Sequence, residues 1–246
     1  MKPAAVAAWR SWNQPNEGWT LFPYTDAIGL LTVGMGNMID ASRGVDGAGL
    51  PWTIGGAPAG RAAAQAQLDA VKAAWPGVQS LACSGLSSIR LTDADVLSLI
   101  DRQIAANEIE LRKSFPGWDT FPADGQAALM SKAWAMGPGF VPAYGFHRFA
   151  ALVNAGQWKA AIPEGHYRGA GTAGRQKQED VAMLNADAVV NGGGSPDTLY
   201  WPGAASGFDF QRAGELALVV GGLLYGLSLL FPADAAAVLR RIASWA

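Results

Sequence analysis

The sequence predicts an α+β fold that is mostly helical, with one small β-hairpin near the N-terminus. Three observations support this prediction. Apolar residues recur at helical spacing through most of the chain after residue 60, while a short segment at 21–37 is rich in Thr, Tyr and Val and is broken by glycines. The chain then ends in a long apolar stretch that a proline divides. Half of the residues are hydrophobic and 15% are charged, as expected for a folded globular chain.

The first helix is predicted over residues 3–17, because Pro3 stands near its start and an Ala-rich segment follows. It ends at Glu17, where Gly18 supplies a helix-stop signal. The hairpin at 21–37 comes next, followed by a Gly/Pro-rich loop. Further helices are expected at 60–75, at 92–113 with a capping box at its start, at 122–136, through 142–163 and at 173–190.

The C-terminal part, residues 192–246, is expected to be an addition to a main domain of residues 1–191. A Gly-rich linker opens it at Asn191–Asp197. The stretch 216–231 then runs for sixteen residues without a charge and is followed by Pro232. The prediction is an apolar helical hairpin, and three interpretations of 213–246 remain open. It packs on the main domain, it enters a membrane, or it docks a partner protein.

Composition excludes several classes of function. The 18 Lys and Arg are few and scattered and the net charge is −2, so we expect no nucleic-acid partner. One cysteine cannot form a disulfide within the chain, and with only two His and one Cys we expect no zinc site. The N-terminal apolar stretch is too short for a secretory signal, which predicts synthesis in the cytoplasm without a signal peptide.

Two carboxylates and a hydroxyl near the hairpin are candidates for chemistry. Hydrolysis of a glycosidic bond needs a proton donor and a second carboxylate that activates water or stabilises the transition state. Glu17 suits the first role and Asp26 the second, while Thr32, six residues later, can point to the same side of the ribbon as Asp26. On this pattern alone the ordinary alternatives stay open. Glu17 is then a solvated helix end, and Asp26 makes only a local turn hydrogen bond.

The spacing of these residues resembles the signature of the phage-type, T-even-like lysozymes and related endolysins, glycoside hydrolase family 24. The matching residues are Glu17, Gly18, Tyr24, Asp26, Gly29, Thr32, Val33, Gly34 and Gly36. Downstream, Ala133–Phe140 resembles the family's helix and glycine turn, and Arg175–Glu179 resembles its Arg-Arg-x-x-Glu element. The chain departs from the pattern where Gln176 replaces the second Arg and Asn37 replaces a His. It also carries an insertion at about 38–91.

The resemblance implies a lysozyme-like fold with a cleft between an N-terminal lobe and a helical lobe. It implies a muramidase that cleaves the β-1,4 bond between N-acetylmuramic acid and N-acetylglucosamine in peptidoglycan glycan strands, with inversion and without a metal or cofactor. We expect the protein to be a monomer. Glu17, Asp26 and Thr32 would be catalytic. Residues that would bind substrate or support the site are Arg175, which would pair with Glu17, and Tyr24, Gly36, Trp134, Met136, Gly137 and His166.

Two other classes of function stay open beside this one. The chain could be a glycan-binding relative without activity, although such a relative would be expected to lose Glu17 or Asp26. It could also be a membrane-active effector that works through the C-terminal apolar segment. A muramidase would act in the periplasm or cell wall after export through a holin or a secretion system, and the sequence does not distinguish a phage endolysin from a secreted effector.

Overall fold

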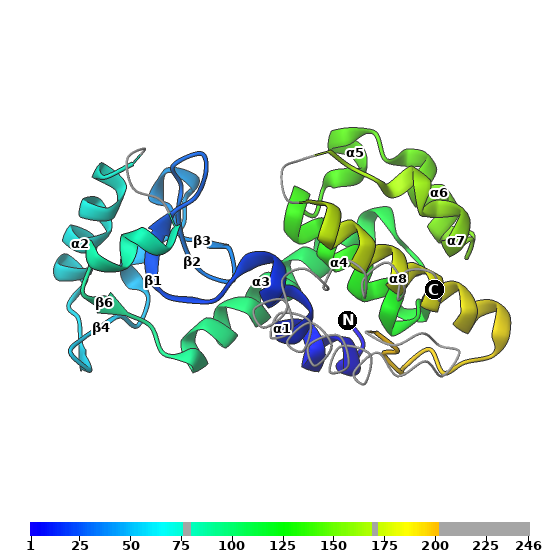
Figure 1. The fold of residues 1–246 in the computed structure, drawn as a ribbon, viewed down its shortest axis with the longest axis horizontal. Helices are drawn as coiled ribbons and strands as arrows, with labels where there is room; N and C mark the ends of the chain where they lie inside the picture. The colour runs from blue at the N-terminus through cyan, green and yellow to red at the C-terminus, as the bar shows by residue number, and fades with distance from the viewer. Residues whose placement is uncertain (76–79, 169–171, 202–246) are drawn as a thin grey trace, which may run out of the picture.

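The computed structural model describes residues 1–75, 80–168 and 172–201. They form two lobes connected by the long helix α3 (Asp93–Ser114) (Figure 1). The smaller lobe contains the strands and helix α2 (Arg61–Ala73). The larger lobe is helical, and it also contains the N-terminal helix α1 (Pro3–Glu17). The predicted class, a mostly helical α+β protein, is confirmed.

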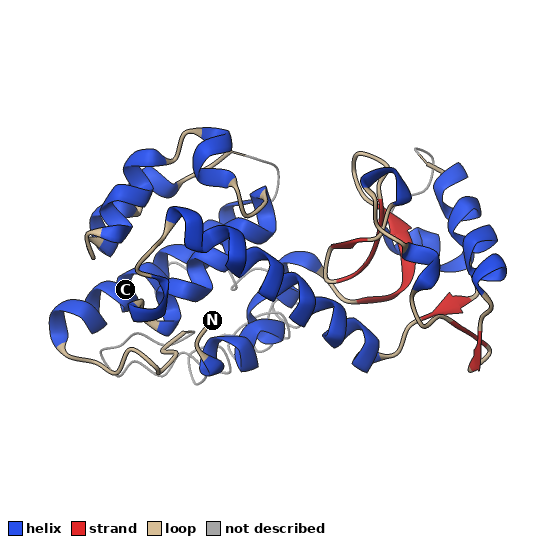
Figure 2. Ribbon diagram, turned by 180° about the vertical axis from the view of Figure 1, so that it is seen from behind, coloured by secondary structure: helices blue, strands red, loops and turns tan. Residues whose placement is uncertain are grey.

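The helical lobe is built around α4 (Ala123–Met136), whose residues from Ala123 to Ala133 are all buried. A helix buried on every side is a core helix, and Figure 2 shows α4 surrounded by its neighbours. Helices α1, α3 and α8 (Thr172–Gly192) pack against it. The remaining helices of this lobe are α5 (Phe140–Tyr144), α6 (His147–Asn154) and α7 (Trp158–Ala161).

The helical pattern predicted through 142–163 is broken into short helices in the structure. Gly145 and Gly156 adopt φ angles of 78° and 73°, a left-handed conformation that ends a helix and that glycine adopts without strain. Short 3-10 helices also occur along the chain: η1 (Ala41–Arg43), η2 (Gly47–Gly49), η3 (Ser80–Gly85), η4 (Trp118–Thr120) and η5 (Pro163–Gly165).

The smaller lobe contains two three-stranded antiparallel sheets, where the sequence predicted one hairpin. The first has the order β1-β2-β3, with β1 (Thr20–Thr25), β2 (Leu31–Gly34) and β3 (Asn37–Met38). The second has the order β5-β4-β6, with β4 (Thr53–Ile54), β5 (Ala57–Pro58) and β6 (Ile89–Arg90). The second sheet arises from the segment predicted as a loop and insertion. Its strands are two residues long, too short for a recognisable alternation of apolar and polar residues.

The inserted segment is anchored to the first sheet by buried polar contacts. The carboxylate of Asp40 accepts hydrogen bonds from the backbone N–H groups of Leu31 and Ser42, each over 2.9 Å, and pairs with Lys72 of α2. Trp52 is buried, and its indole N–H donates to the carbonyl of Gly47 over 2.8 Å. Trp52 therefore anchors the inserted loop and offers no exposed ring to a sugar.

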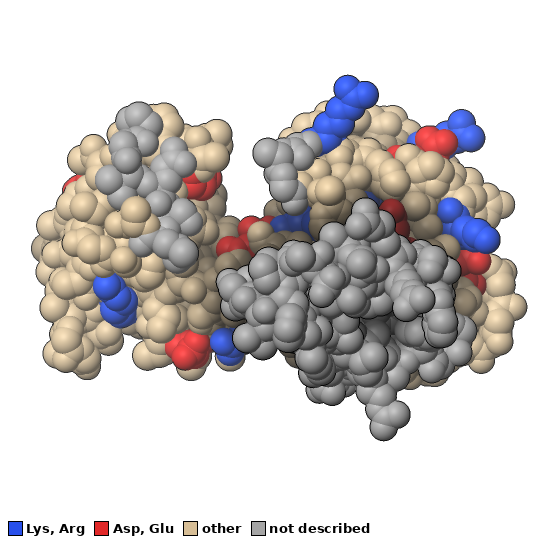
Figure 3. All heavy atoms as spheres, in the orientation of Figure 1, with Lys and Arg blue, Asp and Glu red and all other residues tan. Residues whose placement is uncertain are grey.

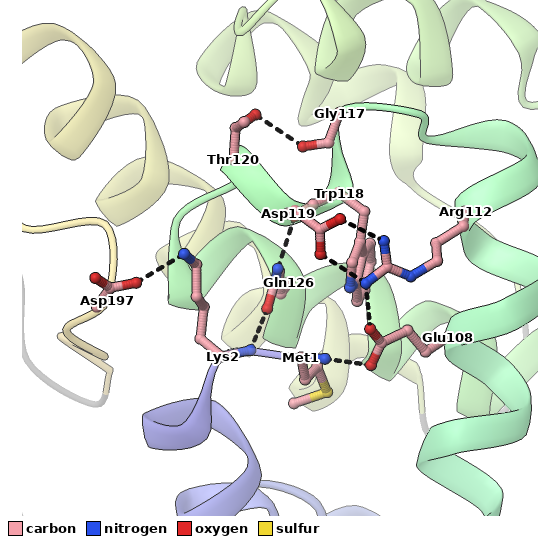
Figure 4. Close-up of polar contacts among 10 residues, drawn as sticks. All are labelled: Met1, Lys2, Glu108, Arg112, Gly117, Trp118, Asp119, Thr120, Gln126 and Asp197. Atoms are coloured by element: carbon pink, nitrogen blue, oxygen red, sulfur yellow. Dashed lines mark hydrogen bonds and ion pairs between the residues drawn. The ribbon is translucent and has the colours of Figure 1, made fainter.

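Polar contacts fix both ends of α3. The predicted capping box is present at the start of α3, between Thr92 and Asp95. Near the end of α3, Arg112 binds Glu108 over 2.7 Å and Asp119 over 2.6 Å, which joins the helix to η4 (Figure 4). The N-terminal ammonium of Met1 also pairs with Glu108, so α1 begins at this network.

The segment after α8 returns to the helical lobe. Buried Asp124 accepts hydrogen bonds from the backbone N–H groups of Tyr200 and Trp201 over 2.8 and 3.0 Å. The ring of Trp201 lies 4.4 Å from that of Trp12. The predicted apolar hairpin of 213–246 lies outside the described residues. Among the residues that are described, no helix is long and apolar enough to cross a membrane.

Candidate active site

A groove separates the two lobes, and acidic and basic side chains meet at its floor (Figure 3). The end of α1 supplies Glu17, and the start of α8 supplies Arg175. Tyr24 and Thr32 lie on β1 and β2, and Asp26 and Gly36 lie in the turns that follow these strands. The structure therefore brings together residues from positions 17 to 36 and residues from beyond position 170.

Glu17 is the last residue of α1, and Gly18 ends the helix with a φ angle of 75°. The carboxylate of Glu17 is one-fifth exposed, and its Oε1 accepts a hydrogen bond from Nη2 of Arg175. Arg175 is itself buried, at 7% exposure, and its Nη1 donates to the carbonyl of Ser131 over 3.3 Å. The predicted pairing of Glu17 with Arg175 is therefore present, and Arg175 is held by α4 as well.

Gly36 lies against the other oxygen of Glu17. A Cβ atom at this position would come 2.8 Å from Oε2 of Glu17 and 3.5 Å from Nε1 of Trp134. Its φ angle of 77° also favours glycine. A side chain here would displace Glu17, so the approach of the β2–β3 turn to the carboxylate requires glycine at position 36.

Asp26 follows β1 and opens the turn to β2. Its Oδ1 accepts hydrogen bonds from the backbone N–H groups of Ile28 and Leu30 over 3.0 and 2.8 Å. The local turn hydrogen bond, which the sequence left as an alternative role for Asp26, is thus present. These bonds fix the direction of the half-buried carboxylate, and they use only one of its two oxygens within the described part of the chain.

Tyr24 lies within electrostatic range of both carboxylates. Burial raises the pKa of the Tyr24 hydroxyl to about 12, and the negative charges of Glu17 and Asp26 contribute to the rise. Tyr24 pairs with Thr32 across the β1–β2 ladder, so the two side chains share one face of the sheet. The hydroxyl of Thr32 is buried and donates to the carbonyl of Leu30 over 3.2 Å, beside the turn that Asp26 begins.

Trp134 has a different environment from a sugar-stacking platform. Its indole N–H donates to the carbonyl of Met35 over 2.9 Å, and its ring centroid lies 5.6 Å from that of Trp9. Trp134 belongs to α4 and Met35 to the turn after β2, so this hydrogen bond connects the two lobes. Trp134 therefore supports the turn that carries Gly36 and the helix that carries Glu17.

Met136, Gly137 and His166 lie at the edge of the helical lobe. Met136 is part of the lining of a pocket of about 410 Å³, together with Tyr144, Phe146 and Tyr167. Gly137 ends α4 with a φ angle of 87°. Nε2 of the half-exposed His166 lies 3.1 Å from the carboxylate of Asp180, so His166 pairs with the surface of α8 and not with Glu17.

Sequence reasoning gave no role to two residues of α8, Gln178 and Glu179, that help to hold Glu17 and Arg175. Gln178 accepts from the side chain of Asn16 over 2.7 Å and donates to the carbonyl of Trp12 over 2.8 Å, which fixes the end of α1 to α8. Glu179 is buried and bonded to α4. Glu179 closes the Arg175–Glu179 element that the sequence singled out, and its distance of four residues from Arg175 places both on one face of the helix.

No cluster of three or more His, Cys, Asp or Glu suited to a metal ion occurs in the part of the chain that the structure describes. Models of known protein families give no match to this chain, and neither do curated proteins. The interpretation of the site therefore depends on its own geometry and on the residue spacing.

Proposed function

We propose that this protein is a peptidoglycan hydrolase of the muramidase type, with a lysozyme-like fold and a substrate groove between its two lobes. The observation that carries the proposal is the arrangement of two carboxylates around Tyr24. Glu17 is held by Arg175 at a helix end, and Asp26 is held by backbone N–H groups in a turn. Two fixed carboxylates on a groove are what acid–base cleavage of a glycosidic bond requires.

Glu17 acts as the general acid. Arg175 donates to Oε1 and carries no acceptor, so the transferable proton of Glu17 belongs on Oε2. That oxygen lies beside Gly36, where a Cβ atom would come within 2.8 Å of it, and the Glu17 side chain is 21% exposed. From Oε2 the proton passes to the leaving glycosidic oxygen as the bond to the anomeric carbon breaks.

Asp26 acts as the general base. Its second oxygen takes the proton of a water molecule that attacks the anomeric carbon from the opposite face of the sugar, and Thr32 helps to hold this water. Attack by water inverts the anomeric configuration and needs a separation of roughly 6.5–9.5 Å between the two carboxyl groups. The residue spacing shared with the phage-type lysozymes supports the same assignment and the same substrate, the bond between N-acetylmuramic acid and N-acetylglucosamine.

The deciding experiment is digestion of purified peptidoglycan by the wild-type protein and by Glu17→Gln, with the released fragments identified by mass. We expect the wild type to release disaccharide units with a reducing muramic acid end, and Glu17→Gln to release none above background. An NMR spectrum recorded during digestion would show the α-anomer first, because the cleaved bond is β and the reaction inverts.

Glu110→Gln is the matched control. Glu110 is an exposed residue on α3 that pairs with Lys113 over 2.7 Å, so this change removes a carboxylate away from the groove. It should leave the digestion rate unchanged. Absence of any released fragment with the wild-type protein overturns the proposal, and binding without release would identify a glycan-binding protein instead.

A further inference from the structure

A fully buried ion pair lies behind the candidate active site. Nζ of Lys132 on α4 is 2.8 Å from Oε2 of Glu179 on α8, and the two side chains are 1% and 0% exposed. Both side chains also make further hydrogen bonds. Oε1 of Glu179 accepts from the hydroxyls of Ser131 and Tyr167 over 2.7 and 3.1 Å, and Lys132 donates to the carbonyl of Gly165 over 2.8 Å.

Stability alone does not account for this pair. Removing two charges from water is costly, and replacing a buried ion pair with apolar residues of similar volume is often neutral or stabilising. What these charged hydrogen bonds supply is direction, because a hydrogen bond weakens steeply away from its preferred geometry. The pair therefore specifies how α4 and α8 fit together.

The same two helices hold Arg175. Glu179 follows Arg175 by one helical turn on α8, so both side chains face α4. Ser131 bonds to both of them, since its hydroxyl donates to Glu179 and its carbonyl accepts from Nη1 of Arg175 over 3.3 Å. Any shift of α8 along α4 that breaks the first contact also moves the guanidinium that holds Glu17.

Tyr167 adds a third connection to the network. Its hydroxyl donates to Glu179, and its ring lines the pocket of about 410 Å³ beside Met136. Burial and the negative charge of Glu179 raise the pKa of Tyr167 above its ordinary value, so the hydroxyl remains a donor throughout the physiological pH range. The segment that carries His166 and Tyr167 is thereby fixed to the same carboxylate.

We propose that Glu179, paired with Lys132, is a positioning residue that sets the placement of Arg175 and through it the orientation of Glu17 for proton transfer. The inference rests on the proposed function, because it assigns Glu179 a part in that reaction. It also goes further, since it places a determinant of the rate in a side chain that no substrate can reach.

The test compares two double variants that both lack the buried charges. Lys132→Met with Glu179→Leu keeps the apolar volume and removes the acceptor for Ser131 and Tyr167. Lys132→Met with Glu179→Gln keeps an acceptor oxygen without a charge. We expect the Leu variant to fold, with kcat on peptidoglycan fragments lowered by about 10- to 100-fold and KM nearly unchanged, since a displacement of about 1 Å costs rates of this order. The Gln variant should recover much of kcat.

Asp124→Asn is the control for a purely structural effect. Asp124 also bridges α4 and α8, through a hydrogen bond of 2.9 Å from Asn185, but it does so at the other end of the helix pair. This variant should lower the free energy of unfolding and leave kcat unchanged. If the Leu variant keeps the wild-type kcat, or if the Gln variant loses as much activity as the Leu variant, the positioning role is wrong.

NMR of the arginine side chains reports the placement of Arg175 without any substrate, and therefore independently of the proposed function. With arginine side chains labelled with ¹⁵N, a guanidinium fixed on Ser131 and Glu17 gives separate Nη signals because its rotation is hindered. We expect separate signals for Arg175 in the wild type and merged signals in the Leu variant. Separate signals in both proteins overturn the inference. A failure of the wild type to cleave peptidoglycan, with merged signals in the Leu variant, would overturn the proposed function and leave the coupling of Glu179 to Arg175 standing.

Discussion

The indole N–H of Trp134 donates to the backbone carbonyl of Met35, and this hydrogen bond of 2.9 Å connects the helical lobe to the turn after β2. The next residue in that turn is Gly36, which lies against Oε2 of Glu17. Trp134 also packs on Trp9 of α1, the helix that ends at Glu17. One side chain thus holds the turn and the helix that meet at the candidate acid, and it sets how closely the lobes approach.

Trp134→Phe should weaken this connection. A smaller aromatic ring replaces the indole and the hydrogen bond is lost, so we expect the free energy of unfolding to fall by about 1 kcal/mol or more and kcat to fall with it. Denaturant unfolding and fragment release from peptidoglycan measure the two effects. Trp118→Phe is the control, because Trp118 is buried yet its Nε1 has no hydrogen-bond partner among the described residues. An unchanged kcat in Trp134→Phe would contradict the role of Trp134 in holding the groove.

Gly36→Ala should inactivate the protein more than it destabilises it. The new methyl group would lie 2.8 Å from Oε2 of Glu17, and the φ angle of 77° adds about 1–2 kcal/mol of backbone strain. Gly44→Ala is the matched control, since Gly44 has a φ angle of 76° and nothing within 4 Å of a new Cβ. Both variants should lose similar stability in thermal unfolding, and only Gly36→Ala should lose kcat. Equal activity in the two variants would show that Gly36 does not govern Glu17.

The titration of Tyr24 tests the arrangement of the carboxylates without any substrate. Burial, Glu17 and Asp26 together raise the pKa of Tyr24 to about 12. Neutralising either acid, by Glu17→Gln or Asp26→Asn, removes a charge that disfavours the phenolate. We therefore expect the pKa of Tyr24 to fall in each variant while remaining above 10, the ordinary value, because burial is unchanged. NMR of labelled tyrosine, assigned with Tyr24→Phe, reports this pKa, and no fall in either variant would place the carboxylates too far from Tyr24.

Much of the fold could be predicted from local sequence signals. The α1 helix and its end at Glu17, the capping box of α3 and the position of α8 all follow from propensity, glycine and hydrophobic period. The second sheet could not be predicted in this way. It pairs β4 with β6, which are far apart in the sequence. Each of these strands has only two residues, too few to show an alternation of apolar and polar residues.

In the candidate site, too, local motifs could be predicted from the sequence and contacts between distant segments could not. Residue spacing identified Glu17, Asp26 and Arg175 because they belong to ordered motifs. The positions of Ser131 and Lys132 behind Arg175 depend on how α4 packs against α8, which no motif records. Trp134 was singled out as a residue that binds substrate or supports the site, but the hydrogen bond of its indole N–H to Met35 could not be predicted, because a Trp on an apolar helix indicates burial and not the partner of its N–H.

Asp40→Asn should loosen the inserted segment from the first sheet. Burial alone would raise the pKa of the Asp40 carboxyl, but hydrogen bonds from Lys72, Ser42 and Leu31 outweigh it and hold that pKa well below its usual range. Replacing the carboxylate with an amide removes the ion pair and leaves donors facing an NH₂ group. We expect the free energy of unfolding at neutral pH to fall by about 2 kcal/mol. Asp46→Asn, which weakens the exposed pair with Arg61 and keeps an oxygen for the backbone N–H of Gly49, should cost less.

The pH dependence of this loss follows from the direction of the pKa shift. A carboxyl whose pKa is lowered on folding stabilises the protein above its unfolded value of about 3.9, and the contribution disappears as the pH falls toward the folded value. The difference in unfolding free energy between the wild type and Asp40→Asn should therefore be constant from neutral pH down to about 5 and should shrink below about 4. Urea unfolding at a series of pH values measures it. A difference that persists undiminished at pH 2 would show that the amide acts through packing and not through the lost charge.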